Sequence, residues 1–229
     1  MLIMPLYIPA IFIISSLACA SWFLFSLSSA ISKKLLLIVS VAVILWLVLQ
    51  SNLSLNGFYL NFNAVPARFL ALVLAPLIAM VLSLVLAGRQ LAQKLSLKKL
   101  TAIHLVRIPV EITLWWLFHK QYVPKLMTFE AGNIDILAGF SAAIILLVAF
   151  NDNVIKQKLL IVWNIAGLLL LFNIIIRALL SIPGPLQRLA FEQPNLAINY
   201  FPFVFLPSVI VPIVLFSHII SLRKLLKSF

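Results

Sequence analysis

Residues 33–50 read KKLLLIVSVAVILWLVLQ, and this stretch decides the class of fold. Of the fifteen residues from Leu35 to Leu49, Ser40 is the only polar one. The run shows neither the alternation of a barrel strand nor the one-sided stripe of a helix on a soluble domain. In lipid every backbone amide and carbonyl group has to be paired, and a helix pairs them within its own segment. The stretch therefore predicts a transmembrane helix.

The same apolar character extends over the whole chain. Hydrophobic residues make up 64% of it and charged residues 10%, against roughly 45–50% and 25% in soluble domains. Five acidic and seventeen basic residues cannot cover the exterior of a soluble fold of this length. We therefore expect an all-α, polytopic membrane protein in which residues 1–229 form a single integral membrane domain.

Seven transmembrane helices are predicted, because a span needs about 20 apolar residues and charged residues mark the gaps between spans. The predicted spans cover residues 6–30, 35–49, 66–87, 100–118, 134–150, 159–180 and 201–222. The first span is interpreted as retained, because a signal peptide starts with a positively charged region and residues 1–32 carry no charge.

The distribution of basic residues predicts the orientation of this seven-helix bundle. Eleven Lys and Arg residues lie on the side of the C-terminus, four lie on the opposite side, and Arg107 and Arg177 lie within spans. Cytoplasmic loops carry the excess of Lys and Arg. We expect the C-terminus in the cytoplasm, the N-terminus outside, and a multi-pass protein of the cell membrane, of the bacterial inner-membrane type.

The net charge of +12 does not indicate a nucleic-acid partner. Nucleic-acid binding needs Lys and Arg gathered on one face, whereas here they lie between the apolar runs. The expected partner is the lipid bilayer with its anionic inner-leaflet headgroups. The single cysteine, Cys19, excludes an intramolecular disulfide. The oligomeric state does not follow from the sequence.

The fourth predicted span carries the sharpest functional signal. Glu111 lies about 15 Å along the helix from Thr101, close to the middle of the bilayer. Arg107 is four residues before Glu111 and shares its helical face, so the two side chains can pair, and His104 continues this polar stripe. Charged groups at this depth are candidates for a site, and a buried ion pair that fixes helix packing is the alternative interpretation. Both remain open at this point.

A second polar group lies on the sixth predicted span and consists of Asn164, Asn173 and Arg177. Asn residues in membrane helices commonly bond a neighbouring helix, so these residues serve either packing or ligand binding. If the outer ends of the helices enclose a cavity, Asp135, Asn133 and Glu130 are candidate partners for Arg177. We include Asp135 and all three residues of this group among the candidate binding residues.

The histidines and prolines give weaker signals. His104 and His218 lie toward the cytoplasmic ends of their spans and could share a depth, but the sequence shows no His pair at i and i+4 and no Cys-x-x-Cys motif. We therefore predict no metal site and no cofactor, with axial haem or metal ligation as the alternative. Pro207 and Pro212 predict a kinked last span with free carbonyl groups at Phe203 and Ser208.

Three functional hypotheses follow from these features. The first is a non-enzymatic membrane protein that binds or translocates a small solute or ion through the polar stripe. The second is a membrane-embedded enzyme acting on a lipid or quinone-like substrate, which needs a lateral opening toward lipid. The third is a structural subunit of a membrane complex. The sequence contains neither a Walker loop nor a Gly-x-Ser-x-Gly motif, so it gives no sign of a nucleotide-binding protein or of a serine hydrolase.

Overall fold

The protein is described by a computed structural model covering residues 3–64, 67–150 and 155–226, and these residues form helices and no strand. The α-helices are α1 (Tyr7–Leu27), α2 (Lys33–Leu55), α3 (Leu70–Leu86), α4 (Gly88–Lys94), α5 (Leu97–Ile103), α6 (Arg107–His119), α7 (Ile136–Val148), α8 (Gln157–Leu180) and α9 (Val211–Leu226). The shorter 3-10 turns are η1 (Phe58–Leu60), η2 (His104–Val106), η3 (Lys125–Met127), η4 (Phe129–Ala131) and η5 (Ala197–Asn199), and η6 (Leu206–Ile210) is a π turn.

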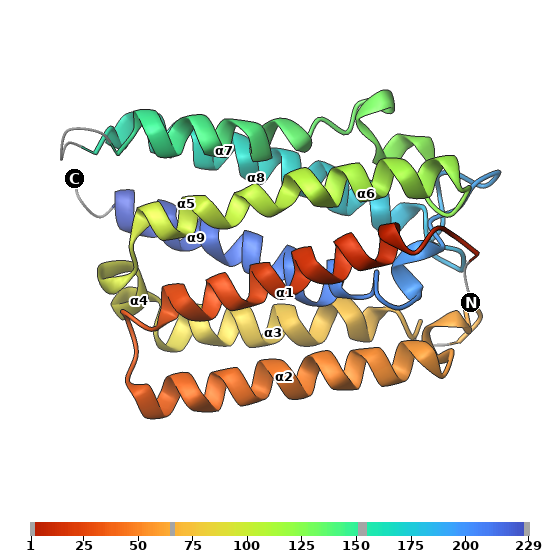
Figure 1. Cartoon of the computed structure of the whole chain (residues 1–229), viewed down its shortest axis with the longest axis horizontal. Helices are drawn as coiled ribbons and strands as arrows, with labels where there is room; N and C mark the ends of the chain where they lie inside the picture. Colours follow the sequence, from red (N-terminus) through yellow and green to blue (C-terminus); the bar gives the residue numbers. More distant parts are fainter. Residues whose placement is uncertain (1–2, 65–66, 151–154, 227–229) are drawn as a thin grey trace.

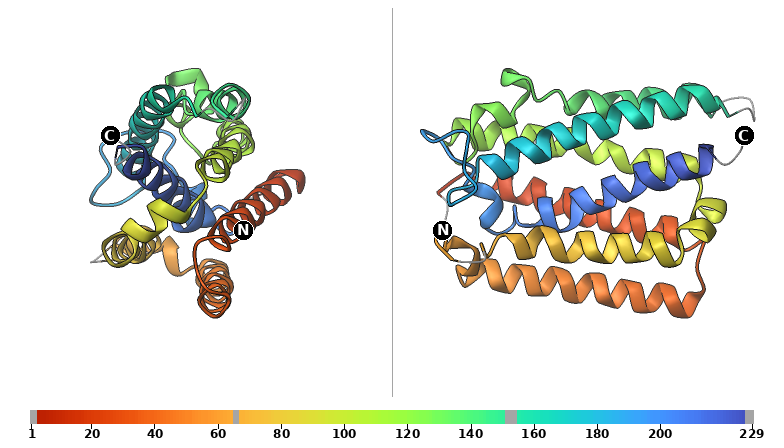
Figure 2. Two further views of the ribbon diagram at one scale, coloured as in Figure 1. Left: turned by 90° about the vertical axis from the view of Figure 1, so that its left-hand side faces the viewer. Right: turned by 180° about the vertical axis from the view of Figure 1, so that it is seen from behind.

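The long helices lie side by side and run back and forth along one axis, and the two chain ends lie at opposite ends of the bundle (Figure 1). The last helix, α9, occupies the interior and packs against α8, α5, α4, α3 and α1. The end-on view shows α9 surrounded by its neighbours, with α2 at the outer edge (Figure 2). The fold is thus a helical bundle built around its C-terminal helix.

Several helices have the length and composition of membrane spans, which confirms the expected class in its coarser form. Among the described residues, five helical stretches qualify: 7–27, 33–55, 97–119, 157–180 and 206–226. The pair α3 and α4, bent by 79°, is a sixth candidate. The thirteen residues of α7 fall short of the usual length. The second helix also extends to Leu55, beyond the predicted end at residue 49.

The outermost helix, α2, is barely buried, with only Gln50 and Ser54 shielded among its residues. Its outer end is held by η1, where the Tyr59 hydroxyl donates a hydrogen bond to the Gln50 side chain. Burial raises the pKa of Tyr59 to about 12, so the phenol keeps the proton that it donates. The rest of α2 presents apolar side chains outward, as a helix in contact with lipid does.

The prolines of the last span deform it as the sequence indicates. Residues 201–205 are not a regular helix, and the span begins instead with the π turn η6, which contains Pro207. Pro212 has no N–H group to donate to the Ser208 carbonyl. The indole of Trp46 on α2 donates to that carbonyl at 3.0 Å, and the Ser208 hydroxyl donates to Val204 O at 2.6 Å. Side chains thus compensate for the interrupted helix.

The connection from α6 to α7 is irregular backbone packed against the bundle. Three side chains donate to its carbonyl groups: Arg177 to Leu126 and Ala131, Asn133 to Met127, and Gln193 to Val123. Gln193 also donates to Phe118 at the end of α6. Irregular backbone inside a membrane protein is tolerated only where protein or water satisfies its polar groups. The segment is therefore fixed by side chains from α8 and from the loop before α9.

We predict that Arg177→Met lowers the free energy of unfolding by about 3 kcal/mol, because two backbone carbonyls and Asn173 Oδ1 lose a charged donor. Thermal unfolding in detergent measures the change. The matched control is Arg188→Met, since Arg188 is exposed and bonds only to adjacent backbone. Equal stability of the two variants would contradict the prediction.

Candidate functional site

The polar stripe of the fourth predicted span lies on a helix that is interrupted in its middle. The stretch from Leu97 to His119 is 23 residues long, and η2 separates α5 from α6 within it. Pro109 cannot donate a backbone hydrogen bond, which favours a tighter turn just before it. His104, Arg107 and Glu111 are all buried on this helix.

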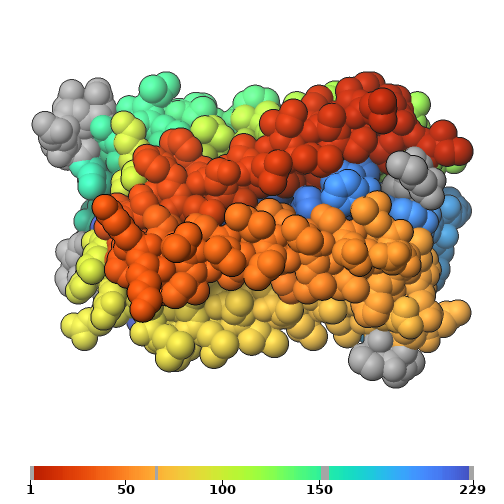
Figure 3. All heavy atoms as spheres, turned by 60° about the horizontal axis from the view of Figure 1, so that its bottom comes forward, coloured from red at the N-terminus to blue at the C-terminus, as the bar shows by residue number. Residues whose placement is uncertain are grey.

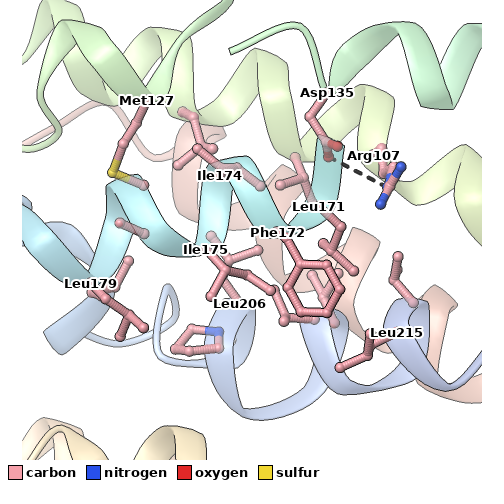
Figure 4. A pocket seen from close by; sticks show the side chains of 18 of the residues that line it. Arg107, Met127, Asp135, Leu171, Phe172, Ile174, Ile175, Leu179, Leu206 and Leu215 are labelled. Atoms are coloured by element: carbon pink, nitrogen blue, oxygen red, sulfur yellow. Dashed lines mark ion pairs between the residues drawn. The ribbon is translucent and has the colours of Figure 1, made fainter. Parts of the chain in front are cut away.

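Arg107 forms an ion pair with Asp135 across the bundle. Its Nε lies 3.4 Å from Asp135 Oδ2, and both side chains are almost fully buried (Figure 4). The Nη2 atom of Arg107 donates to the Gly167 carbonyl on α8 at 3.2 Å. The ion pair that we expected between Arg107 and Glu111 is not among those formed by the described residues. Asp135 takes that place because it directly precedes α7, which packs against α6.

Glu111 is held by an amide instead. Its Oε2 accepts a hydrogen bond from Asn133 Nδ2 at 2.7 Å, and Asn133 Oδ1 accepts from the backbone N–H of Asp135 at 3.3 Å. Asn133 therefore links the Glu111 carboxylate to the backbone at Asp135 through one side chain. Since Arg107 is ten residues beyond Leu97, or about 15 Å along the axis, these groups lie near the middle of the span.

Two histidines lie on the other side of Arg107. The rings of His104 and His218 stack with their centroids 3.9 Å apart, and His218 Nδ1 lies 2.9 Å from Asn164 Oδ1. The edge of Trp163 packs against His104 with a centroid distance of 5.1 Å. The sequence indicated that the histidines could share a depth, and the structure places them in direct contact.

Gly167 allows these groups to meet. A Cβ atom at this position would lie 2.5 Å from His218 Cε1 and 2.8 Å from its Nε2, and 3.6 Å from Arg107 Nη1. A Cβ here would collide with the His218 ring and would only touch Arg107, so glycine leaves the room that His218 needs. We call the connected, buried set the polar cluster; its members are His104, Arg107, Glu111, Asn133, Asp135, Asn164 and His218.

Several atoms of the polar cluster have no hydrogen-bond partner within the described part of the chain. They are both ring nitrogens of His104, Nε2 of His218, Nη1 of Arg107 and Oδ1 of Asp135. Buried polar atoms nearly always have a partner, and an exception indicates a bound water, an ion or a functional site. These unpartnered atoms include hydrogen-bond donors and acceptors, so they can bind a ligand group that accepts a hydrogen bond or one that donates it.

A cavity of about 160 Å³ adjoins the polar cluster, and we call it the Arg107 cavity. Arg107, Glu111 and Asp135 form its polar wall, and the remaining lining is apolar side chains from α3, η3, α6, α8, η5, η6 and α9. Figure 4 shows Arg107 and Asp135 beside several of these apolar side chains. Phe172 also lines the cavity and is 47% exposed. The cavity therefore reaches the outer surface of the bundle beside α8.

The structure separates the predicted site residues into two groups. Arg107, Glu111 and Asp135 meet at the Arg107 cavity, and His104 and Asn164 belong to the adjoining cluster. Asn173 and Arg177 form a separate unit, because Arg177 binds Asn173 and backbone carbonyls. Pairing of Arg177 with the side chains of Glu130, Asn133 or Asp135 is not among the contacts of the described residues.

Three residues at the polar cluster are not identified as such by the sequence. The sequence indicates Asn133 only as a partner for Arg177 and His218 only as one of a histidine pair, and the predicted site does not include Gly167. One local signal in the sequence indicates close packing. Asn164 and Gly167 lie three residues apart on an otherwise apolar helix. Among the described residues no three His, Cys, Asp or Glu side chains converge to hold a metal ion.

The fold and the site define an all-α protein with several helices able to span a membrane and a buried polar cluster in its interior. Residues 64–226 match the family described as Domain of unknown function (DUF8737). The match covers more than half of the 229 residues, and the chain belongs to this family. Comparison with curated proteins and with solved structures finds no match.

We predict that Gly167→Ala lowers the free energy of unfolding by about 1–3 kcal/mol, because the added methyl group displaces His218. Helix propensity alone would give the opposite sign, since Ala favours a helix over Gly by about 1 kcal/mol. The control is Ala166→Leu at the neighbouring exposed position. The double variant Gly167→Ala/His218→Ala should recover part of the loss, and no recovery would contradict the steric explanation.

Proposed function

We propose that the chain crosses a cell membrane seven times, with its N-terminus outside and its C-terminus in the cytoplasm, in a membrane of the bacterial inner-membrane type. Two observations support this topology. The helices alternate in direction and the chain ends lie at opposite ends of the bundle (Figure 1). Ten of the sixteen basic residues in the described part of the chain lie on the side on which α9 ends. In this topology α7 crosses together with the irregular segment that precedes it.

Cysteine labelling tests the orientation. In a Cys19→Ser background, a membrane-impermeant maleimide applied to intact cells should label Leu186→Cys, because residue 186 lies on the proposed outer side. Lys98→Cys should react only after permeabilisation. Leu186 and Lys98 are both exposed. A difference in labelling therefore reports the side of the membrane on which each position lies, and not its burial. Labelling of Lys98→Cys in intact cells would rule out the proposed orientation.

We further propose that the protein binds and translocates a small solute or ion that carries a positive charge. The observation that carries this proposal is the set of unpartnered polar atoms on the wall of the Arg107 cavity. The carboxylates of Glu111 and Asp135 and the guanidinium of Arg107 line the cavity, and their formal charges add up to a net charge of −1. Uncompensated charge is costly in a low-dielectric interior, so a cation or a proton is the ligand that would balance it.

The start of α7 supports the same proposal. Asp135 lies at the N-terminus of α7 and contacts Arg107 halfway along the 97–119 stretch, so α7 begins at half depth. Helices that begin at this depth provide ligand sites in many transporters, because their ends leave backbone groups without a helical partner. A zwitterionic solute could then bind Asp135 Oδ1 through its cation and Arg107 Nη1 through its anion.

Flux into vesicles tests this function. Purified protein is reconstituted with dyes that report pH and Na⁺ inside the vesicle, and amino acids serve as zwitterionic probes in parallel thermal-shift measurements. We expect Asp135→Asn and Glu111→Gln to reduce the initial flux or the apparent affinity about tenfold, which corresponds to the loss of one charged contact.

The control for this experiment is Glu130→Gln, a carboxylate that pairs with His119 and Lys125 near the surface and lies outside the Arg107 cavity. Its flux should equal that of the wild type. Unchanged flux in Glu111→Gln and Asp135→Asn, combined with a lower unfolding temperature, would overturn the proposal and assign the charges to packing.

The second candidate is an enzyme acting on a lipid or quinone-like molecule, and the position of Phe172 favours it. The Arg107 cavity has apolar walls and reaches the bundle surface there, so a lipid-soluble molecule could enter laterally and meet Glu111. Chemical turnover of added lipid extract by the purified protein, lost in Glu111→Gln, distinguishes this function from transport.

A further inference from the structure

A second and larger apolar space lies on the opposite flank of the bundle from α8. It has a volume of about 630 Å³ and is lined by α1, α2, α3, η6 and α9, together with Ile31, Ala87 and Leu91. We call it the α2 groove. Its volume is within the roughly 300–1,000 Å³ of ligand sites in proteins. It shares no lining residue with the Arg107 cavity.

The α2 groove exists because small side chains face each other where the helices meet. Ala20 on α1, Ala42 on α2, and Ala75 and Ala79 on α3 line it. Larger residues at these places would let the helices pack directly, as they do in close-packed interiors. The helix α2 lies on the outer face of the molecule beside α1 and α3 (Figure 3). The groove is therefore the space that α2 covers.

The α2 groove opens to the side and is closed at its deep end. Leu35 and Ile38 line it and are themselves 45% and 55% exposed, so the groove is accessible from the surface along the first half of α2. At the other end, Trp46 lines the groove and its indole is fixed on the Ser208 carbonyl. From Leu35 to Trp46 the helix rises about 16 Å, which is half of the roughly 30 Å hydrocarbon core. The groove has the depth of one leaflet.

The open end of the α2 groove is basic. Lys33 and Lys34 directly precede Leu35, and Arg89 lies between the lining residues Ala87 and Leu91. All three basic side chains are exposed, and none of the ion pairs formed by the described residues includes them. The sequence contains no acidic residue before Glu111, so the helices α1 to α5 offer no carboxylate to compete for these cations.

We propose that the α2 groove binds one acyl chain of an anionic phospholipid, whose phosphate is held by Lys33, Lys34 and Arg89. An apolar channel of leaflet depth fits a single hydrocarbon chain, and basic groups at the interface attract anionic headgroups. The bound lipid fills the space between α2 and the rest of the bundle and thereby attaches the least buried helix. This site is independent of the proposed solute site, and its test does not depend on the orientation in the membrane.

Native mass spectrometry of the full-length protein tests this proposal. The protein is released from detergent micelles after titration with phosphatidylglycerol or with phosphatidylcholine of the same chains. We expect one retained phosphatidylglycerol and weaker binding of phosphatidylcholine. Lys33→Gln/Lys34→Gln/Arg89→Gln should weaken phosphatidylglycerol binding about tenfold or more and leave phosphatidylcholine unchanged. Lys120→Gln/Lys125→Gln/Arg188→Gln is the charge-matched control at the other end of the bundle.

A second variant tests the groove itself. Ala42→Phe/Ala79→Phe fills the α2 groove from two sides and should abolish the retained lipid. Leu37→Phe/Ile44→Phe adds aromatic rings to exposed positions of α2 outside the groove and should retain it. If Ala42→Phe/Ala79→Phe does not fold, the variant without Lys33, Lys34 and Arg89 still tests the proposal, because its three substitutions are at exposed positions.

Four results would overturn the proposal. The first is equal binding of the two lipids, which would show that the basic residues select no headgroup. The second is an undiminished lipid adduct in the filled variant. The third is a wild-type dimer that the filling substitutions dissociate, which would make the groove a contact between copies. Displacement of the lipid by soluble glycerol phosphate would equally show a phosphate site without an acyl chain.

Discussion

The structure depends on one constraint, which is that polar groups removed from water have to find their partners within the protein. The irregular connection between α6 and α7 shows how the chain meets it, because Arg177, Asn133 and Gln193 donate to the carbonyl groups of that connection. The same constraint explains why Trp46 binds the Ser208 carbonyl that Pro212 leaves free. Two of the atoms that lack a partner within the described part of the chain, Arg107 Nη1 and Asp135 Oδ1, belong to residues that line a cavity.

Small residues decide how closely the helices approach. Gly167 lets His218 lie against α8, and Gly139 lets Ile108 lie against α7, since a Cβ at Gly139 would lie 2.7 Å from Ile108 Cγ1. On the other flank the small residues of α1, α2 and α3 face one another and leave the α2 groove between them. A small residue thus gives close packing where a large side chain from the neighbouring helix fills the space beside it. Where the neighbouring helix also has a small residue, the space stays open.

The family match divides the molecule in an informative way. Residues 64–226 contain every member of the polar cluster, from His104 to His218, whereas α1 and α2 precede the matched region. The Arg107 cavity is accordingly built within the family region, because its lining comes from α3, α6, α8, η6 and α9 together with Met127, Asp135 and Ile198. The α2 groove needs residues from both parts. The proposed solute site is thus a feature of the family region, and the proposed lipid site belongs to its junction with the first two helices.

The sequence by itself determined the all-α class, most of the helices and the burial of Arg107 and Glu111, because long apolar runs and charges within them are local signals. It also indicated the break caused by the prolines before α9. Only the tertiary structure decided that Arg107 pairs with Asp135, that Asn133 binds Glu111, and that the rings of His104 and His218 stack. These contacts join residues that lie between 22 and 114 positions apart. Such pairings depend on which helices become neighbours and on how far α7 extends, and no local pattern of residues encodes either.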